Sequence, residues 1–237
     1  MKKTTTILCL GIALCMLGCS DDDDQVTTTS TVPFSLTASL SPRSSDAEDT
    51  GILQGNWDAN SQLAVIKTGS SSVPKSILTR KTDSSDTFTG NLSTLVKNEN
   101  EIAVFYPAAA ITANSSDTLT QTLNLSGQDG TLAGITNYDY LWAQCKAGRT
   151  ETTGSSACEM TSLVTIGKFQ FTVNGGSPLN NITRITITAT AGTLYSSAVM
   201  KLKNGEFSST QTGNITIKNN AGISGTPYIS IFPSEAQ

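Results

Sequence analysis

Histidine is absent from the 237-residue sequence, and charged residues make up only 14% of it. Without histidine the chain lacks the commonest general base, the usual imidazole ligand for metals and every Ser-His or Cys-His nucleophilic pair. It also has no glycine-rich phosphate loop and no cysteine cluster at zinc spacing. No long stretch carries the i, i+3, i+4, i+7 apolar period of an amphipathic helix. We therefore expect neither an enzyme, nor a bound metal or cofactor, nor a helical fold.

The composition that remains is typical of short strands joined by polar turns, because threonine, serine, glycine and asparagine are abundant. Removal of the first 18 residues as a signal peptide takes away Lys2 and Lys3 and leaves 13 of the 15 basic residues. Against 19 acidic residues, the mature chain then has a net charge of −6. A basic nucleic-acid footprint is therefore missing. A little over two hundred mature residues suffice for one large or two small cores. The predicted fold class is all-β.

The first 18 residues have the pattern of a secretory signal peptide. Two lysines precede an apolar run, residues 7–17, that is too short to span a bilayer permanently. Gly18-Cys19 resembles the lipobox that lipoprotein signal peptidase reads, with Met16 where such motifs prefer leucine. The resemblance implies acylation of Cys19; the alternative is a reduced cysteine at the end of the signal helix. Acyl chains contribute about 0.8 kcal/mol per buried methylene, so two or three would anchor the protein to a membrane that it does not span.

An acidic run follows the cysteine and opens a polar tether over residues 19–31, which continues as a threonine-rich stretch. Charges of one sign repel one another and cannot pack into a core, so the tether should be extended and solvated. Preceded by the cysteine, the run also resembles the acidic export tether with which some didermic bacteria send lipoproteins to the outer face of the outer membrane. Both interpretations are open. The residues concerned are Ser20, Asp21, Asp22, Asp23 and Asp24.

Period-2 alternation marks the expected strands. Residues 32–40 place Phe34, Leu36, Ala38 and Leu40 on one face, and residues 118–125 alternate in the same way. The apolar run 101–107 is the strongest central strand of the first half, and Asn204-Gly205 predicts a two-residue hairpin turn. Strands at this spacing are typical of sandwiches. We expect a boundary near residues 161–167, and hence sandwiches over 32–163 and 164–237.

Two cysteines remain once Cys9 and Cys15 leave with the signal peptide and Cys19 is acylated. Cys145 and Cys158 flank a polar loop, and such a pair favours a disulfide in an oxidising compartment. Closing a loop of this size would contribute about 3 kcal/mol in the chain-entropy model. The alternative is two buried or idle thiols.

Several features follow one another along the chain: the anchored signal, a first strand followed by Arg43, Trp57-Asp58 before an apolar strand, residues 102–107, Gln128 before residues 138–143, residues 169–171 and residues 228–233. Their order along residues 32–233 resembles the fimbrillin family of anchored, type V pilin-like surface lipoproteins. Members occur in gut and oral didermic bacteria and consist of two transthyretin-like β-sandwich domains in tandem. The resemblance implies a fimbrial subunit or fimbrium-associated lipoprotein that supports adhesion from the cell outer membrane, with other fimbrial subunits as partners.

The family also implies a mode of assembly. In polymerising members an outer-surface protease cuts after an arginine that follows the first strand, and a strand from another subunit fills the groove that opens. Arg43 stands at this position; the alternative is an ordinary solvated loop arginine. Family members continue past the strand that matches residues 228–232, whereas this chain ends at Gln237. Three explanations stay possible: the sequence is a fragment, a truncated product, or a member that accepts a strand but cannot donate one. We expect an incomplete second sandwich with an open edge beside residues 215–217 or 228–232.

A monomeric surface module that binds glycans or proteins is the alternative function. Its candidate stacking platforms are Trp57, Tyr138, Tyr140 and Trp142, which could equally be core residues. Asp117-Thr118-Leu119 also resembles the short acceptor motif for protein O-glycosylation in such bacteria, which would make Thr118 a modification site.

Overall fold

The computed structural model describes residues 30–41, 51–69, 73–112, 120–173, 176–179 and 181–233. Within them the chain is nearly all β, so the predicted fold class is confirmed. Helical structure in these described ranges is limited to α1 (Leu132–Ile135) and the 3₁₀ turns η1 (Gly51–Gln54) and η2 (Ala108–Ala110). The strands are β1 (Thr31–Leu40), β2 (Gln62–Lys67), β3 (Ser76–Arg80), β4 (Thr87–Ser93), β5 (Glu101–Tyr106), β6 (Thr120–Asn124), β7 (Leu141–Lys146), β8 (Gly148–Arg149), β9 (Gly154–Ser162), β10 (Thr165–Lys168), β11 (Ile182–Ile187), β12 (Tyr195–Lys201), β13 (Phe207–Thr212), β14 (Ile215–Ile223) and β15 (Tyr228–Ile231).

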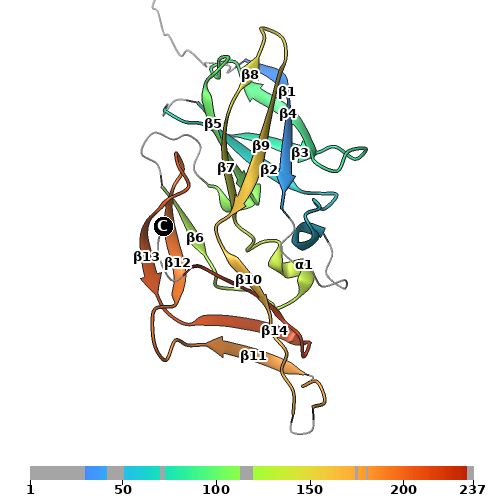
Figure 1. Cartoon of the computed structure of the whole chain (residues 1–237), viewed down its shortest axis with the longest axis vertical. Helices are drawn as coiled ribbons and strands as arrows, with labels where there is room; N and C mark the ends of the chain where they lie inside the picture. Colours follow the sequence, from blue (N-terminus) through green and yellow to red (C-terminus); the bar gives the residue numbers. More distant parts are fainter. Residues whose placement is uncertain are drawn as a thin grey trace, which may run out of the picture.

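One large sheet forms the upper part of the molecule in Figure 1. Its strand order is β1-β4-β3-β2-β5-β7-β9-β8, and β1 also pairs with β9, so the sheet returns on itself. The pairing of β1 is antiparallel to β4 and parallel to β9. The first strand of the chain is therefore the element that closes the ring around the first core.

Three smaller sheets form the lower part: β10-β15, β11-β14 and β13-β12-β6. The sequence places residues 118–125 in the first sandwich, whereas β6 pairs with β12 along residues 120–124 and 197–201. Leu123 and Leu125 pack in the second core. Alternation shows correctly that these leucines share a buried face, but it does not show which core that face meets.

The two cores share a wall made of β2 and β5. Along β2, Leu63 and Val65 face the first core, while Ala64 and Ile66 face the second. β5 divides in the same way, with Phe105 in the second core. A strand that is buried on both faces needs a continuous apolar run, which explains why these two strands have no polar alternation in the sequence.

The hairpin between β12 and β13 is longer than the two-residue turn that Asn204-Gly205 predicts. Met200 pairs with Phe207, the amide of Gly205 donates to the carbonyl of Lys201, and Leu202 is fully buried. Gly205 has a φ of 72°, and a Cβ there would lie 2.6 Å from Cδ2 of Trp142. The loop therefore folds against the indole of Trp142, and only glycine fits at the contact.

Candidate assembly site around the first strand

β1 fills the space between β4 and β9, which we name the β1 slot. Residues 31–37 pair with residues 93–87 of β4, and residues 34–40 pair with residues 154–160 of β9. Of the predicted inward set, Phe34, Leu36 and Ala38 are buried and Leu40, the last residue of the strand, is partly buried. Val32 joins the buried face. The alternation thus positions one apolar face on the core and one polar face in solvent.

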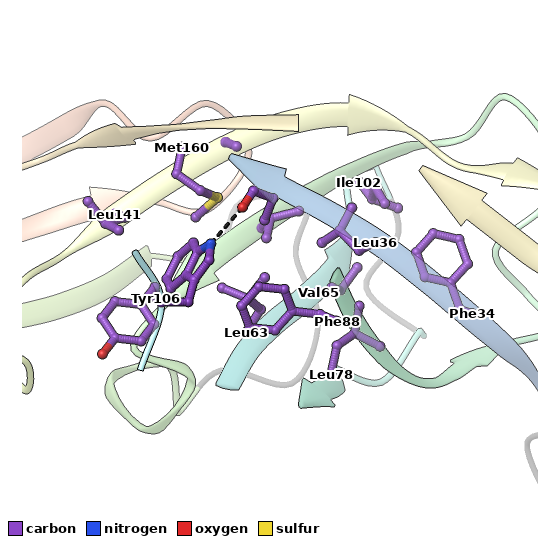
Figure 2. Packing of buried hydrophobic residues seen from close by; sticks show 14 of the residues in the cluster. Phe34, Leu36, Leu63, Val65, Leu78, Phe88, Ile102, Tyr106, Leu141 and Met160 are labelled. Atoms are coloured by element: carbon purple, nitrogen blue, oxygen red, sulfur yellow. Dashed lines mark hydrogen bonds between the residues drawn. The ribbon is translucent and has the colours of Figure 1, made fainter. Parts of the chain in front are cut away.

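The inward side chains of β1 complete the first core. Figure 2 shows the side chains of Phe34 and Leu36 on the first strand, and both belong to the first core. Full burial of a valine, leucine or phenylalanine contributes roughly 1.5–3 kcal/mol, so loss of β1 would expose a costly apolar groove. The members of the same core that Figure 2 labels on β2 to β5 are Leu63, Val65, Leu78, Phe88, Ile102 and Tyr106.

Trp57 holds the C-terminal end of β1. Its buried Nε1 donates to the carbonyl oxygen of Ala38 at 2.6 Å, and Figure 2 draws this bond. The indole packs edge-on against Phe88, with 5.0 Å between ring centroids, and against Tyr106 at 5.2 Å. Sequence reasoning noted Trp57-Asp58 but missed this contact, because nothing local connects a tryptophan to a carbonyl 19 residues earlier.

Phe34 faces a glycine on each neighbouring strand, and the glycine on β9 makes room for its ring. Its partner across the ladder is Gly90 on β4 and Gly154 on β9. A Cβ at position 154 would lie 2.6 Å from Cδ2 of Phe34, and one at position 90 would lie 2.6 Å from the carbonyl oxygen of Ile77. The slot is therefore shaped for a large side chain at this position of the inserted strand.

The side chain of Gln128 makes hydrogen bonds to the backbone of β15 that a neighbouring strand would otherwise make. Its Oε1 accepts from the amide of Ser230 at 2.7 Å, and its Nε2 donates to the carbonyls of Ser230 at 3.1 Å and Leu125 at 3.0 Å. The amide of Tyr228 donates to the carbonyl of Gly130. Residues 128–130 thus cover the edge of β15, one of the two places where the sequence predicts an open edge. Gln128 itself is 1% exposed.

The four aromatic candidates for glycan stacking divide into two pairs. Trp57 and Tyr140 are buried, whereas Tyr138 and Trp142 are partly buried. The hydroxyl of Tyr140 donates to the carbonyl of Asn124 at 2.8 Å, and burial raises the pKa of Tyr140 to about 12. Trp57 and Tyr140 are therefore core residues, as the competing interpretation predicts, and the other two remain candidates.

Most of the predicted modification and processing sites lie outside the described residues. These are Cys19, Ser20, Asp21, Asp22, Asp23, Asp24, Arg43 and Thr118. In the sequence, Arg43 comes three positions after Leu40, the last residue of β1. Cys145 and Cys158 are described, carry free thiols and are partly buried on β7 and β9. Their disulfide stays a prediction.

The described part of the chain contains no group of three or more His, Cys, Asp or Glu side chains that could hold a metal ion. Nor does any helix in this part have the length and apolar character needed to cross a membrane.

The fold is found in solved bacterial proteins. No protein-family model matches the sequence, and a search of curated proteins found no match. A "putative cell adhesion protein" of Bacteroides ovatus superposes with a TM-score of 0.53 at 17% identity, over 88% of this chain and 80% of that chain. A protein of the same description from Bacteroides uniformis gives 0.49 at 14% identity, over 86% and 76%. A fimbrial assembly protein of Parabacteroides distasonis gives 0.40 at 11% identity, over 86% of both chains.

Proposed function

We propose that this protein is a fimbrial subunit or fimbrium-associated surface lipoprotein that assembles by strand complementation and supports adhesion. It shares its fold with the Bacteroides ovatus protein that is described as a "putative cell adhesion protein". The observation that carries the proposal is the position of β1, which closes the first sheet with two ladders and supplies its core with apolar side chains. Within the proposed role this chain performs no catalysis.

Cleavage after Arg43 would leave β1 attached to the rest of the fold by noncovalent contacts alone. Departure of β1 would expose the edges of β4 and β9 and the apolar residues of the first core that β1 covers. Such an unpaired edge beside a groove binds a complementary strand through main-chain hydrogen bonds and alternate side chains. A strand from another subunit, with a large residue opposite Gly90 and Gly154, would restore the sheet.

The order of the sequence couples this opening to release from the membrane. The anchor at Cys19, the acidic tether and β1 all precede Arg43. After one cut, the departure of β1 would therefore detach the folded body from its lipid and empty the β1 slot at the same time. The acidic tether, in its export role, would place this event on the outer face of the outer membrane.

Gel electrophoresis of surface material tests the proposal. The wild-type protein should give a ladder of polymers that resists mild denaturation, and Arg43→Ala should give only the anchored monomer. Arg80→Ala is the matched control and should keep the ladder, because Arg80 lies on β3, where its Nε donates to the carbonyl of Ser85. A ladder that persists in Arg43→Ala would overturn the proposal.

The alternative, a monomeric surface module that binds glycans, is favoured by one observation. Trp142 borders a cavity of about 430 Å³ between β7, the β12–β13 loop and residues 161–165. Aromatic faces beside polar groups are suited to sugar rings. A discrete monomer whose binding to an oligosaccharide array is lost in Trp142→Ala would support this function against the first.

A further inference from the structure

Cys145 and Cys158 lie opposite each other on neighbouring strands. β9 pairs with β7 at Leu141 and Trp142 and with β8 at Gly148 and Arg149, in one continuous register. This register sets Cys145 across from Cys158, and both side chains pack against the first core. Facing residues of an antiparallel pair have Cα atoms about 4.5–5.5 Å apart, which lies within the range that a disulfide spans.

The stretch of β9 that contains Cys158 depends strongly on β1. Residues 154–160 pair with residues 34–40 of β1, and Cys158 itself faces Ala38. On the other side of β9, between its two ladders, the hydroxyl of Ser156 donates to the carbonyl of Lys146 at 2.6 Å and accepts from the amide of Gly148 at 3.2 Å. A β9 that has lost β1 therefore has few backbone hydrogen bonds to hold this stretch in place.

The two thiols differ in acidity. The Cys158 thiol donates to Sδ of Met160 at 3.9 Å. Its interaction with Cys145 lowers the pKa of Cys145, whereas that interaction and burial raise the pKa of Cys158. Since the thiolate is the nucleophile, Cys145 is the cysteine that begins thiol–disulfide exchange.

We infer that Cys145 and Cys158 form a disulfide that joins β7 to β9. This bond keeps β9, which borders the β1 slot, in place after β1 has left. This role rests on the proposed function, because only a chain that loses β1 needs the bond for that purpose. The bond links β9 to a strand that is itself paired with β5 along its whole length. The acceptor groove would therefore stay open and ordered until a new strand arrives.

The oxidation needs a disulfide of the protein thiol-oxidase class as its electron acceptor. The Cys145 thiolate attacks one sulfur of that disulfide, its S–S bond breaks, and a mixed disulfide forms. Cys158 then loses its proton and attacks Sγ of Cys145, which releases the second thiolate of the oxidase. Two thiols of this protein lose two protons and two electrons, and the oxidase disulfide becomes a dithiol.

The first experiment tests the bond without any cleavage. The full-length Arg43→Ala variant is extracted from cell envelopes in detergent, denatured and alkylated before and after reduction. We expect both cysteines to react only after reduction. Alkylation of both without reductant would overturn the inference.

The second experiment tests the role of the bond. Amide hydrogen exchange of residues 154–160 is compared in oxidised and reduced wild-type protein after cleavage by an arginine-specific protease. Exchange should be at least about tenfold faster in the reduced form after cleavage and should differ by less than about twofold in the uncleaved Arg43→Ala variant. Equal exchange in the cleaved forms would overturn the role. Neither experiment involves assembly, so a missing polymer ladder would contradict the proposed function and leave these results standing.

Discussion

Trp57 makes a buried side-chain contact with β1, the 2.6 Å hydrogen bond from its indole to the carbonyl of Ala38. Trp57→Phe removes that donor and leaves a buried carbonyl, so we expect a loss of about 1–3 kcal/mol in the free energy of unfolding, measured with urea. Trp142→Phe is the matched control, because its buried Nε1 has no hydrogen-bond partner among the residues that the structure describes. Equal losses in the two variants would contradict the role of Trp57.

Two buried tyrosines predict how stability depends on alkaline pH. Burial raises the pKa of Tyr106 and of Tyr140 to about 12, against about 10 in the unfolded chain. Above pH 10 the unfolded chain releases protons that the folded chain keeps, so stability should fall between pH 10 and 12. The loss is up to about 1.4 kcal/mol per pH unit for each tyrosine. In an ultraviolet titration at least two of the five tyrosines should ionise late while the protein stays folded; five that ionise together near pH 10 would contradict this.

At the level of strands, the side chain of Gln128 supplies two of the hydrogen bonds that cover the edge of β15. Gln128→Leu keeps the size of that side chain but leaves the amide and carbonyl of Ser230 without their partner. We expect a loss of about 2–5 kcal/mol in unfolding free energy. Gln144→Leu is the control, because Gln144 is exposed and makes one bond to the carboxylate of Glu101 at 3.2 Å, and should cost less than about 0.5 kcal/mol. Similar losses in both variants would show that Gln128 does not hold the edge.

Strand identity followed from the sequence more readily than strand partnership. The alternation over residues 32–40 predicted β1 and three of its buried residues, and the apolar run 101–107 predicted β5. The same kind of pattern over residues 118–125 could not show that β6 pairs with β12, because period 2 defines a face and not a neighbour. The contact of Gln128 with Ser230 joins positions that are 102 residues apart, and no local sequence pattern predicts it.

The candidate site was predicted only in outline. The strand that fills the slot could be recognised, but Gly90 and Gly154 read as ordinary strand or turn glycines until their register with Phe34 is known. The predicted processing site Arg43 and lipidation site Cys19 lie outside the described residues, so they stay predictions.

The molecule should unfold as one cooperative unit, because β2 and β5 contribute to both cores. Trp57 belongs to the first core and Trp142 packs against the second, so the fluorescence of each reports on one core. In urea, the Trp142→Phe variant observed through Trp57 should unfold in one step that coincides with its circular dichroism transition. The same coincidence is expected for Trp57→Phe observed through Trp142. Two separated transitions in either variant would show that the cores are independent.

Exchange of the first strand is the property on which the account depends, and peptide binding measures it directly. A fluorescent peptide with the sequence of residues 30–41 is added to protein cleaved after Arg43 and to uncleaved Arg43→Ala protein. We predict saturable binding to the cleaved protein alone, and none for a peptide with Leu36→Asp, because Leu36 is fully buried in the slot. Equal binding to both proteins, or binding that Leu36→Asp leaves unchanged, would contradict the account.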